Sequence, residues 1–153
     1  MVESLNHTRK KEVKVFKFSK RSKDNLATAD EKLQLLFNEV IKEIDCTVIS
    51  GHRTPEEQFK LFKNGRERVD GWWTVTDKSK VVTNLDGTTR KSRHNYYPSK
   101  AVDVVPYPLD WKDIDSFKLL ASVVKRKALE LGIDVEWGGD WKTFKDYPHW
   151  QIK

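Results

Sequence analysis

Two histidines and one aspartate are the side chains of this sequence best suited to do chemistry. Asp103 interrupts the apolar run 101–105, His94 lies shortly before that run, and His149 lies near the C-terminus. An ionised carboxylate in an apolar strand is costly to bury unless a metal ion or a cation compensates its charge. Catalytic zinc ions typically take three protein ligands of these types and keep water in the fourth position. The sequence therefore predicts a His/Asp/His site with Zn²⁺ as its cofactor.

Asp103 alone permits a second interpretation, in which a half-buried strand aspartate pairs with an arginine. The strand by itself does not separate the two interpretations. A cysteine-based structural zinc site is excluded, because the chain has one cysteine. That residue, Cys46, lies in an apolar run and is expected to be a buried, unreactive thiol.

Two further residues could complete a catalytic site. Asp146 stands three residues before His149, close enough to lie beside a metal without binding it. A carboxylate there can take a proton from the attacking water and later pass it to the leaving amine. Arg53 lies between a predicted strand and a predicted helix, where its guanidinium can hold a substrate carboxylate and stabilise charge. The alternatives are a solvated turn aspartate and a surface arginine paired with Glu56 or Glu57.

Three helices are predicted to position these residues. The first covers residues 28–44, where apolar side chains recur at helical spacing and Thr28 with Glu31 can form a capping box. The second begins with Thr54 as its cap and Pro55 in its first turn. The third covers about residues 113–131 and ends at a glycine.

Short strands are predicted around these helices, over residues 46–50, 101–105, 133–137 and 149–152. Residues 66–91 show no sustained period and are expected to form a long loop or hairpin beside the site. Strand alternation allows Asp103 and His149 to point at one spot if their strands are neighbours. Because helices and strands do not alternate as βαβ units, we expect an α+β fold with a small antiparallel sheet flanked by helices.

Length and charge limit the class of protein. A chain of 153 residues suits one domain, and we expect a basic N-terminal arm or edge strand over residues 1–23 followed by a catalytic domain over residues 24–153. The net charge of +6 suits a polyanionic partner, either nucleic acid or an acidic cell wall. The N-terminus lacks an apolar signal region, and no stretch approaches the roughly 18 apolar residues that span a bilayer. We therefore expect a cytoplasmic protein without a signal peptide or a membrane partner.

Four motifs occur in the order found in the VanY-type D-alanyl-D-alanine carboxypeptidase family of zinc peptidases. They are Ser50-Gly51-His52-Arg53-Thr54-Pro55-Glu56-Glu57-Gln58, Ser92-Arg93-His94, Ala101-Val102-Asp103-Val104-Val105-Pro106 and Asp146-Tyr147-Pro148-His149-Trp150-Gln151. The chain most resembles the phage endolysin branch, the L-alanyl-D-glutamate endopeptidases that cut the stem peptide of peptidoglycan. The resemblance runs from about residue 29 to the C-terminus and implies a Hedgehog/DD-peptidase-like fold.

The resemblance implies a role for each candidate residue. His94, Asp103 and His149 would bind zinc, Asp146 would be the catalytic base, and Arg53 would bind a substrate carboxylate and stabilise the oxyanion.

Three more positions match the family more loosely. Ser92 and Gln58 would support the site from behind its ligands. Trp141, in a glycine-rich turn, would wall the substrate groove, although a core tryptophan is an equal alternative. One spacing departs from the family: Asp103 comes nine residues after His94, and the usual pattern is shorter.

The candidate residues and the resemblance together imply a zinc metallopeptidase that hydrolyses peptidoglycan stem peptides, and the resemblance implies a phage endolysin acting on the L-Ala–D-Glu bond. Its partner would be the anionic cell wall, reached from the host cytoplasm after release, and the chain would be a monomer. The alternatives are a D-Ala-D-Ala carboxypeptidase of the same fold and a basic nucleic-acid- or wall-binding module without catalysis. A nucleic-acid-binding module would not explain why His94, Asp103 and His149 occur together, so we expect no nucleic acid partner.

Overall fold

The computed structural model of this protein describes residues 14–153. Its centre is a four-stranded antiparallel sheet with the order β1-β4-β6-β5. The strands are β1 (Cys46–Ser50), β4 (Ala101–Pro106), β5 (Val135–Trp137) and β6 (His149–Ile152). The predicted α+β class with a small antiparallel sheet is confirmed.

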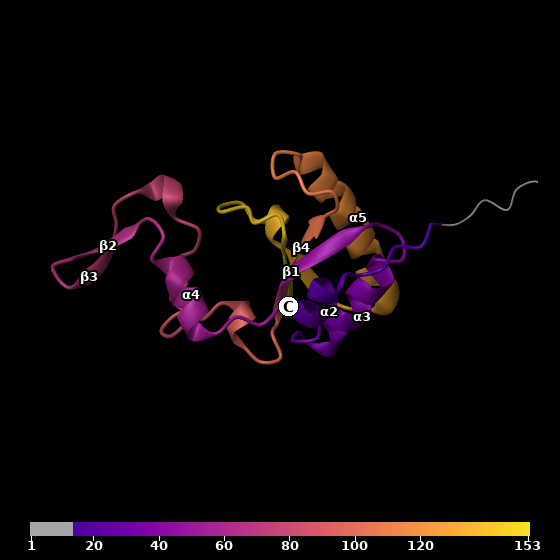
Figure 1. The fold of residues 1–153 in the computed structure, drawn as a ribbon, viewed down its shortest axis with the longest axis horizontal. Coiled ribbons are helices and arrows are strands. Elements are labelled where there is room, and N and C mark those ends of the chain that lie inside the picture. Colours follow the sequence, from indigo (N-terminus) through magenta and orange to yellow (C-terminus); the bar gives the residue numbers. More distant parts are fainter. Residues whose placement is uncertain (1–13) are drawn as a thin grey trace, which may run out of the picture.

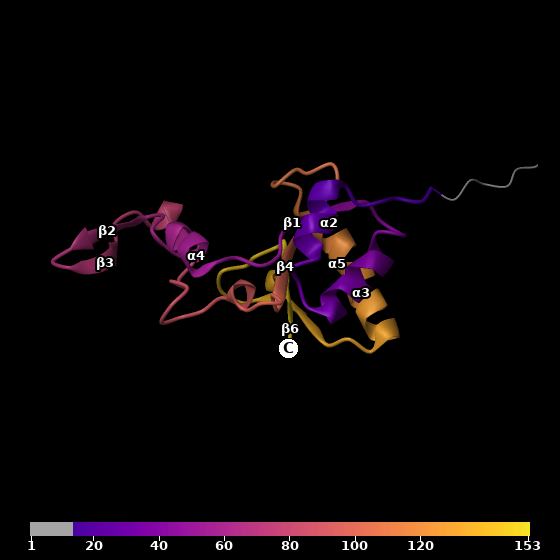
Figure 2. The ribbon, with the colours of Figure 1, turned by 60° about the horizontal axis from the view of Figure 1, so that its bottom comes forward.

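The helices divide between the two sides of this sheet. Helices α2 (Lys20–Leu26), α3 (Glu31–Val40) and α5 (Ile114–Leu131) lie together on one side (Figure 1). Helix α4 (Pro55–Phe62) lies on the other side with a hairpin of β2 (Arg66–Val69) and β3 (Trp72–Val75), as Figure 2 also shows. Of residues 66–91, predicted as a long loop or hairpin, residues 66–75 form the hairpin and the rest is a loop with one short 3₁₀ turn, η1 (Lys78–Lys80).

The hydrophobic core lies between the sheet and helices α3 and α5. Phe37 of α3 meets the edge of Trp150, and Trp150 stacks on Trp137. Most of the apolar positions that predicted these two helices are buried there: Leu33, Leu36, Phe37, Val40, Ile41, Phe117, Leu120, Val124 and Ala128. Ile44 and Val123, from the same pattern, are only partly buried against the core. In the described part of the chain, this core has no buried member between Val48 and Val102.

Residues 55–91 therefore form an arm that is held by other contacts. Trp73 of the hairpin meets the edge of Phe59, and the guanidinium of Arg66 lies 4.0 Å from the ring centre of Phe62. Arg66 also donates to the carbonyl of Thr83 at 2.8 Å, which ties the hairpin to the loop after it. The arm thus stands apart from the main core and forms a wall on the open side of the sheet (Figure 2).

Helix α4 begins as predicted. Thr54 accepts from the backbone N–H of Glu57, and the Glu57 carboxylate accepts from the N–H of Thr54, both at 3.1 Å. Helix α5 is also confirmed: Asp113 caps it, and Gly132 ends it at φ 69°, a left-handed conformation that favours glycine.

Helix α3 begins later than predicted, because Asp30 and not Thr28 is its cap. The Asp30 carboxylate accepts from the N–H of Lys32 at 2.8 Å. The Thr28 hydroxyl donates to the carbonyl of Asn25 at 2.7 Å and accepts from the N–H of His52 at 2.8 Å. Thr28 is therefore engaged in long-range packing, and the predicted capping box with Glu31 is wrong.

The segment 1–23 was predicted to be a basic arm or an edge strand, and the structure describes its residues 14–23. Residues 14–19 form no strand, so the edge-strand alternative is wrong there. Ser19 caps α2, which runs across residue 23, and Phe18 and Ser22 are buried against the domain. Residues 1–13 lie outside the described part of the chain.

Candidate metal centre

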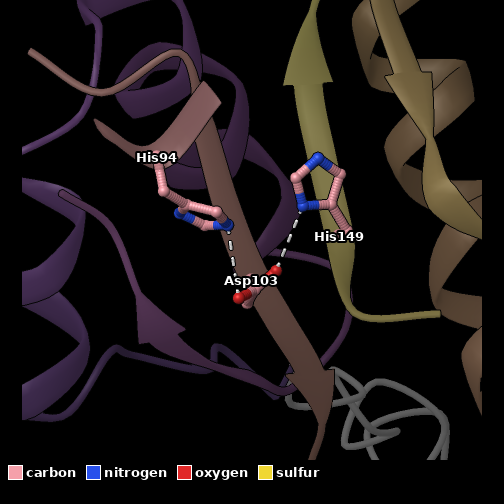
Figure 3. A group of neighbouring side chains, drawn as sticks. All are labelled: His94, Asp103 and His149. Carbon is pink, nitrogen blue, oxygen red and sulfur yellow. Dashed lines mark ion pairs between the residues drawn. The ribbon is translucent and has the colours of Figure 1, made fainter. Parts of the chain in front are cut away.

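The sheet brings two of the three candidate ligands together. Asp103 of β4 lies directly opposite His149 of β6, on the face opposite the core-facing Val102 and Val104. His94 comes from a short 3₁₀ turn, η2 (Arg93–Asn95), before β4. Figure 3 shows the three side chains converging, with Asp103 between the two rings.

The distances fit a shared metal ion. His94 Nε2 lies 3.3 Å from Asp103 Oδ2, and His149 Nδ1 lies 3.5 Å from Asp103 Oδ1. The candidate ligand atoms all lie within 4.8 Å of one another. His94 Nε2 and Asp103 Oδ1 are buried, and neither makes a hydrogen bond within residues 14–153. Since a buried polar atom without a partner costs about 1–3 kcal/mol, this donor set fits a cation held between the side chains.

A turn and a close backbone approach hold His94 in place. The Ser92 hydroxyl accepts from the N–H of His94 at 3.2 Å, and Asn95 Oδ1 accepts from the N–H of Ser92 at 2.8 Å. His94 Nδ1 lies 2.7 Å from the carbonyl of Gly51, an acceptor that places the proton on Nδ1 and leaves Nε2 free for a metal. Glycine is required at position 51, because a Cβ there would lie 2.2 Å from the carbonyl oxygen of Asn25.

Arg53 reaches the same site from the loop before α4. Its guanidinium donates to Gln58 Oε1 at 2.8 Å and lies 3.4 Å from Asp103 Oδ2. The Gln58 side chain is buried, and its amide nitrogen donates to the carbonyl of Leu85 at 3.0 Å. The surface pairing of Arg53 with Glu56 or Glu57 is therefore not formed.

Asp103 and Asp146 have different electrostatic environments. Burial disfavours the ionised form of Asp103, but His94 and His149 outweigh burial and hold the pKa of Asp103 well below its usual range. Burial, followed by the charge of Asp103, raises the pKa of Asp146. Asp146 Oδ2 lies 3.9 Å from His149 Nδ1. A carboxyl group with a raised pKa beside a metal site is suited to accept and return a proton.

A groove of about 850 Å³ runs over the three candidate ligands. Residues 81–85 of the arm line this groove together with Trp141, Thr143, Phe144, Lys145 and Asp146 from the segment before β6. The ring of Trp141 lies 5.1 Å from the ring of His149, so this tryptophan lines the groove and is not a core residue. Lys91, Arg93 and Lys145 also line the groove, which makes its rim basic.

The longer loop between His94 and Asp103 leaves the site intact. Ser99 is buried in this loop, and its backbone exchanges hydrogen bonds with Thr28 and Asp30 at 2.9 Å each. The extra residues are thus packed against the connection between α2 and α3, and both candidate ligands still meet.

Two residues beside the site were not assigned a role from the sequence. Gln151 contacts His149, and Glu136 contacts both Gln151 and Trp141. Strand alternation places Gln151 on the same face as His149, which is a usable signal. Glu136 carries no such signal, because its place beside Gln151 depends on the pairing of β5 with β6.

No helix within residues 14–153 has the length and apolar character needed to cross a bilayer.

Comparisons with known proteins agree with this geometry. The profile of the phage L-alanyl-D-glutamate peptidase family matches residues 14–152. The L-alanyl-D-glutamate peptidase of Escherichia phage T5 is 29% identical over 143 residues, which cover 90% of each chain. The peptidoglycan L-alanyl-D-glutamate endopeptidase CwlK of Bacillus subtilis is 34% identical over 119 residues, which cover 72% of this chain and 62% of CwlK.

A solved structure extends the likeness to the whole fold. The crystal structure of the L-Ala D-Glu endopeptidase ChiX of Serratia marcescens superposes with a TM-score of 0.68 at 30% identity, covering 93% of this chain and 92% of ChiX. With a family profile that matches almost the whole described chain, this protein belongs to the phage L-alanyl-D-glutamate peptidase family.

Proposed function

We propose that this protein is a zinc-dependent endopeptidase that hydrolyses the L-Ala–D-Glu bond in the stem peptide of peptidoglycan. The observation that carries the proposal is the set of His94, Asp103 and His149 in the groove, with two buried atoms that find no hydrogen-bond partner among residues 14–153. Relatives with this activity in their names match most of the chain. The family and the site thus support the same reaction.

Zinc is the metal that suits this donor set. Two imidazoles and one carboxylate, with room for further ligands on the groove side, are typical of catalytic zinc sites. When bound, the ion supplies a Lewis acid and lowers the pKa of a coordinated water. His94 and His149 supply neutral nitrogen ligands, and Asp103 supplies the charge that holds a dication in a largely buried site.

Asp146 moves the proton in this proposal. Its carboxylate lies beside His149, close to the candidate ligands without being one of them, and its pKa is raised by burial and by Asp103. It accepts a proton from the attacking water and returns it to the amine of the leaving D-Glu residue.

Arg53 stabilises the negative charge that develops on the substrate during hydrolysis. Gln58 and Asp103 hold its guanidinium at the edge of the site, so the donors are in place before the substrate binds. Preorganised donors of this kind stabilise the oxyanion that develops on the scissile carbonyl.

The groove and the surface charge suit the substrate. Stem peptides carry free carboxylates, and Lys91, Arg93 and Lys145 place positive charge on the groove rim. Trp141 offers a flat wall beside His149. The net charge of +6 attracts an anionic wall, an effect that should weaken as salt rises. We further propose a monomeric endolysin that is made in the host cytoplasm and acts on the wall after release.

The test is mass spectrometry of purified peptidoglycan after incubation with the zinc-loaded protein. A chelated sample and the Asp146→Asn variant serve as controls. Stem peptides that begin at D-Glu would support the proposal, and loss of terminal D-Ala would identify a carboxypeptidase. A product that forms equally in the chelated sample, or no product at all, would refute the zinc-dependent peptidase.

A further inference from the structure

Behind His149, on the side away from Asp103, a chain of hydrogen bonds runs across β6 and β5. His149 Nε2 lies 2.8 Å from Gln151 Oε1. Gln151 Nε2 donates to Glu136 Oε2 at 3.0 Å, and Trp141 Nε1 donates to Glu136 Oε1 at 3.0 Å. Glu136 and Gln151 are direct partners in the sheet, so backbone pairing sets their separation. These hydrogen bonds therefore connect Trp141, which lines the groove, to the candidate metal ligand His149.

The chemistry of these groups determines which group donates and which accepts in each of these hydrogen bonds. A carboxylate only accepts hydrogen bonds, and an indole N–H only donates. Glu136 therefore requires Gln151 to present its NH₂ group, which turns the carbonyl oxygen of Gln151 toward His149. An amide oxygen only accepts, so Nε2 must carry the proton of the neutral imidazole. The lone pair is then on Nδ1, the atom that faces Asp103.

We propose that Glu136 and Gln151 are positioning residues that set the tautomer of His149 and so keep Nδ1 available to the metal. Glu136 acts through Gln151, because its carboxylate determines which way the amide of Gln151 points. This inference rests on the proposed function only in assigning His149 as a metal ligand.

The variant Glu136→Gln keeps the shape of the side chain but replaces one acceptor oxygen with an NH₂ donor. Trp141 would still donate to the oxygen of the new amide, so the new NH₂ group would face Gln151. Gln151 would then have to turn its own oxygen toward position 136 and its NH₂ group toward His149. That arrangement requires an acceptor at Nε2 and moves the proton to Nδ1, where the metal binds. Loss of an outer hydrogen-bond partner of a ligand typically weakens metal binding about 10–100-fold, and we expect that range.

The reciprocal swap Glu136→Gln/Gln151→Glu should reverse the loss. The amide at position 136 would accept from Trp141 and donate to the carboxylate at position 151. That carboxylate would accept from His149 Nε2 and restore the original tautomer. Asp134→Asn is a matched control, because the Asp134 side chain is 79% exposed just before β5 and contacts Lys153, not the site.

The experiment measures zinc affinity by chelator competition, starting from the zinc-loaded proteins. We expect weaker binding in Glu136→Gln, recovery to within a few-fold of wild type in the swap, and no change in Asp134→Asn. Unchanged affinity in Glu136→Gln, or no recovery in the swap, would overturn the inference. A merely structural role predicts that two substitutions are at least as harmful as one.

A second readout needs no variant. Nitrogen-15 NMR of the zinc-loaded protein reports which nitrogen of His149 carries the proton and which one binds the metal. Protonated Nε2 in the wild type is the expected result, and protonated Nδ1 would overturn the inference even if every variant misfolds. Both readouts are independent of hydrolysis, so an inactive protein that shows them would refute the proposed function and leave this inference standing.

Discussion

Removal of the metal should destabilise the fold, and the site indicates by how much. Without the ion, His94 Nε2 and Asp103 Oδ1 stay buried and have no hydrogen-bond partner in the described part of the chain. At about 1–3 kcal/mol for each such atom, the cost is about 2–6 kcal/mol of unfolding free energy. Because 1 kcal/mol corresponds to about 2–4 °C in a domain of this size, zinc should raise the melting temperature by roughly 4–24 °C.

The assay is thermal unfolding followed by circular dichroism at fixed free zinc concentrations, from chelated to saturated protein. An ion that binds only the folded state stabilises it by about 4.1 kcal/mol at 1,000 times its dissociation constant, so the increase should grow with the logarithm of free zinc. His149→Gln should lose most of the increase. His52→Gln is the matched control, because the His52 ring packs against Tyr97 and neither lines the groove nor belongs to the candidate ligand set.

Two results would refute this reasoning. A melting temperature that is the same with zinc and with chelator would mean that the buried atoms find other partners. An equal loss of the zinc effect in His52→Gln and His149→Gln would mean that zinc binds elsewhere.

The remaining predictions concern single residues. Asp146→Asn should lower kcat about 10²–10⁴-fold and leave the zinc content unchanged, and loss of zinc would make Asp146 a ligand instead. Arg53→Lys should lower kcat about 10²–10³-fold, because an ammonium cannot reproduce the donors held by Gln58; unchanged kcat would remove Arg53 from the reaction. Burial raises the pKa of the Cys46 thiol to about 12, so thiol reagents should label only unfolded protein, and rapid labelling of the folded state would contradict its burial. Arg126 and Lys127 lower the pKa of Glu43 to about 2. Its stabilising contribution is therefore complete above its ordinary pKa of about 4.3 and is lost as the pH falls toward 2. Melting temperatures of wild type and Glu43→Gln should converge over that range, and a constant difference would contradict the ion pair.

Local patterns in the sequence were sufficient for most helices and strands. Apolar spacing located α3 and α5, and the capping box of Thr54 with Glu57 located the start of α4. Thr28 shows where local reasoning fails. It satisfies the capping pattern, but its hydroxyl donates to the carbonyl of Asn25, three residues earlier, and accepts from the N–H of the distant His52 in place of a helix N–H.

The sequence alone determined which side chains could bind a metal, because an ionisable residue in an apolar strand needs compensation wherever that strand lies. Only the tertiary structure decided how the site is built around them. The Gly51 carbonyl that accepts from His94, the Leu85 carbonyl that accepts from Gln58 and the Glu136 carboxylate that accepts from Gln151 all lie far from their partners in the sequence. Residue type and spacing identify the groups that require partners, but strand order and loop packing determine which distant groups meet them.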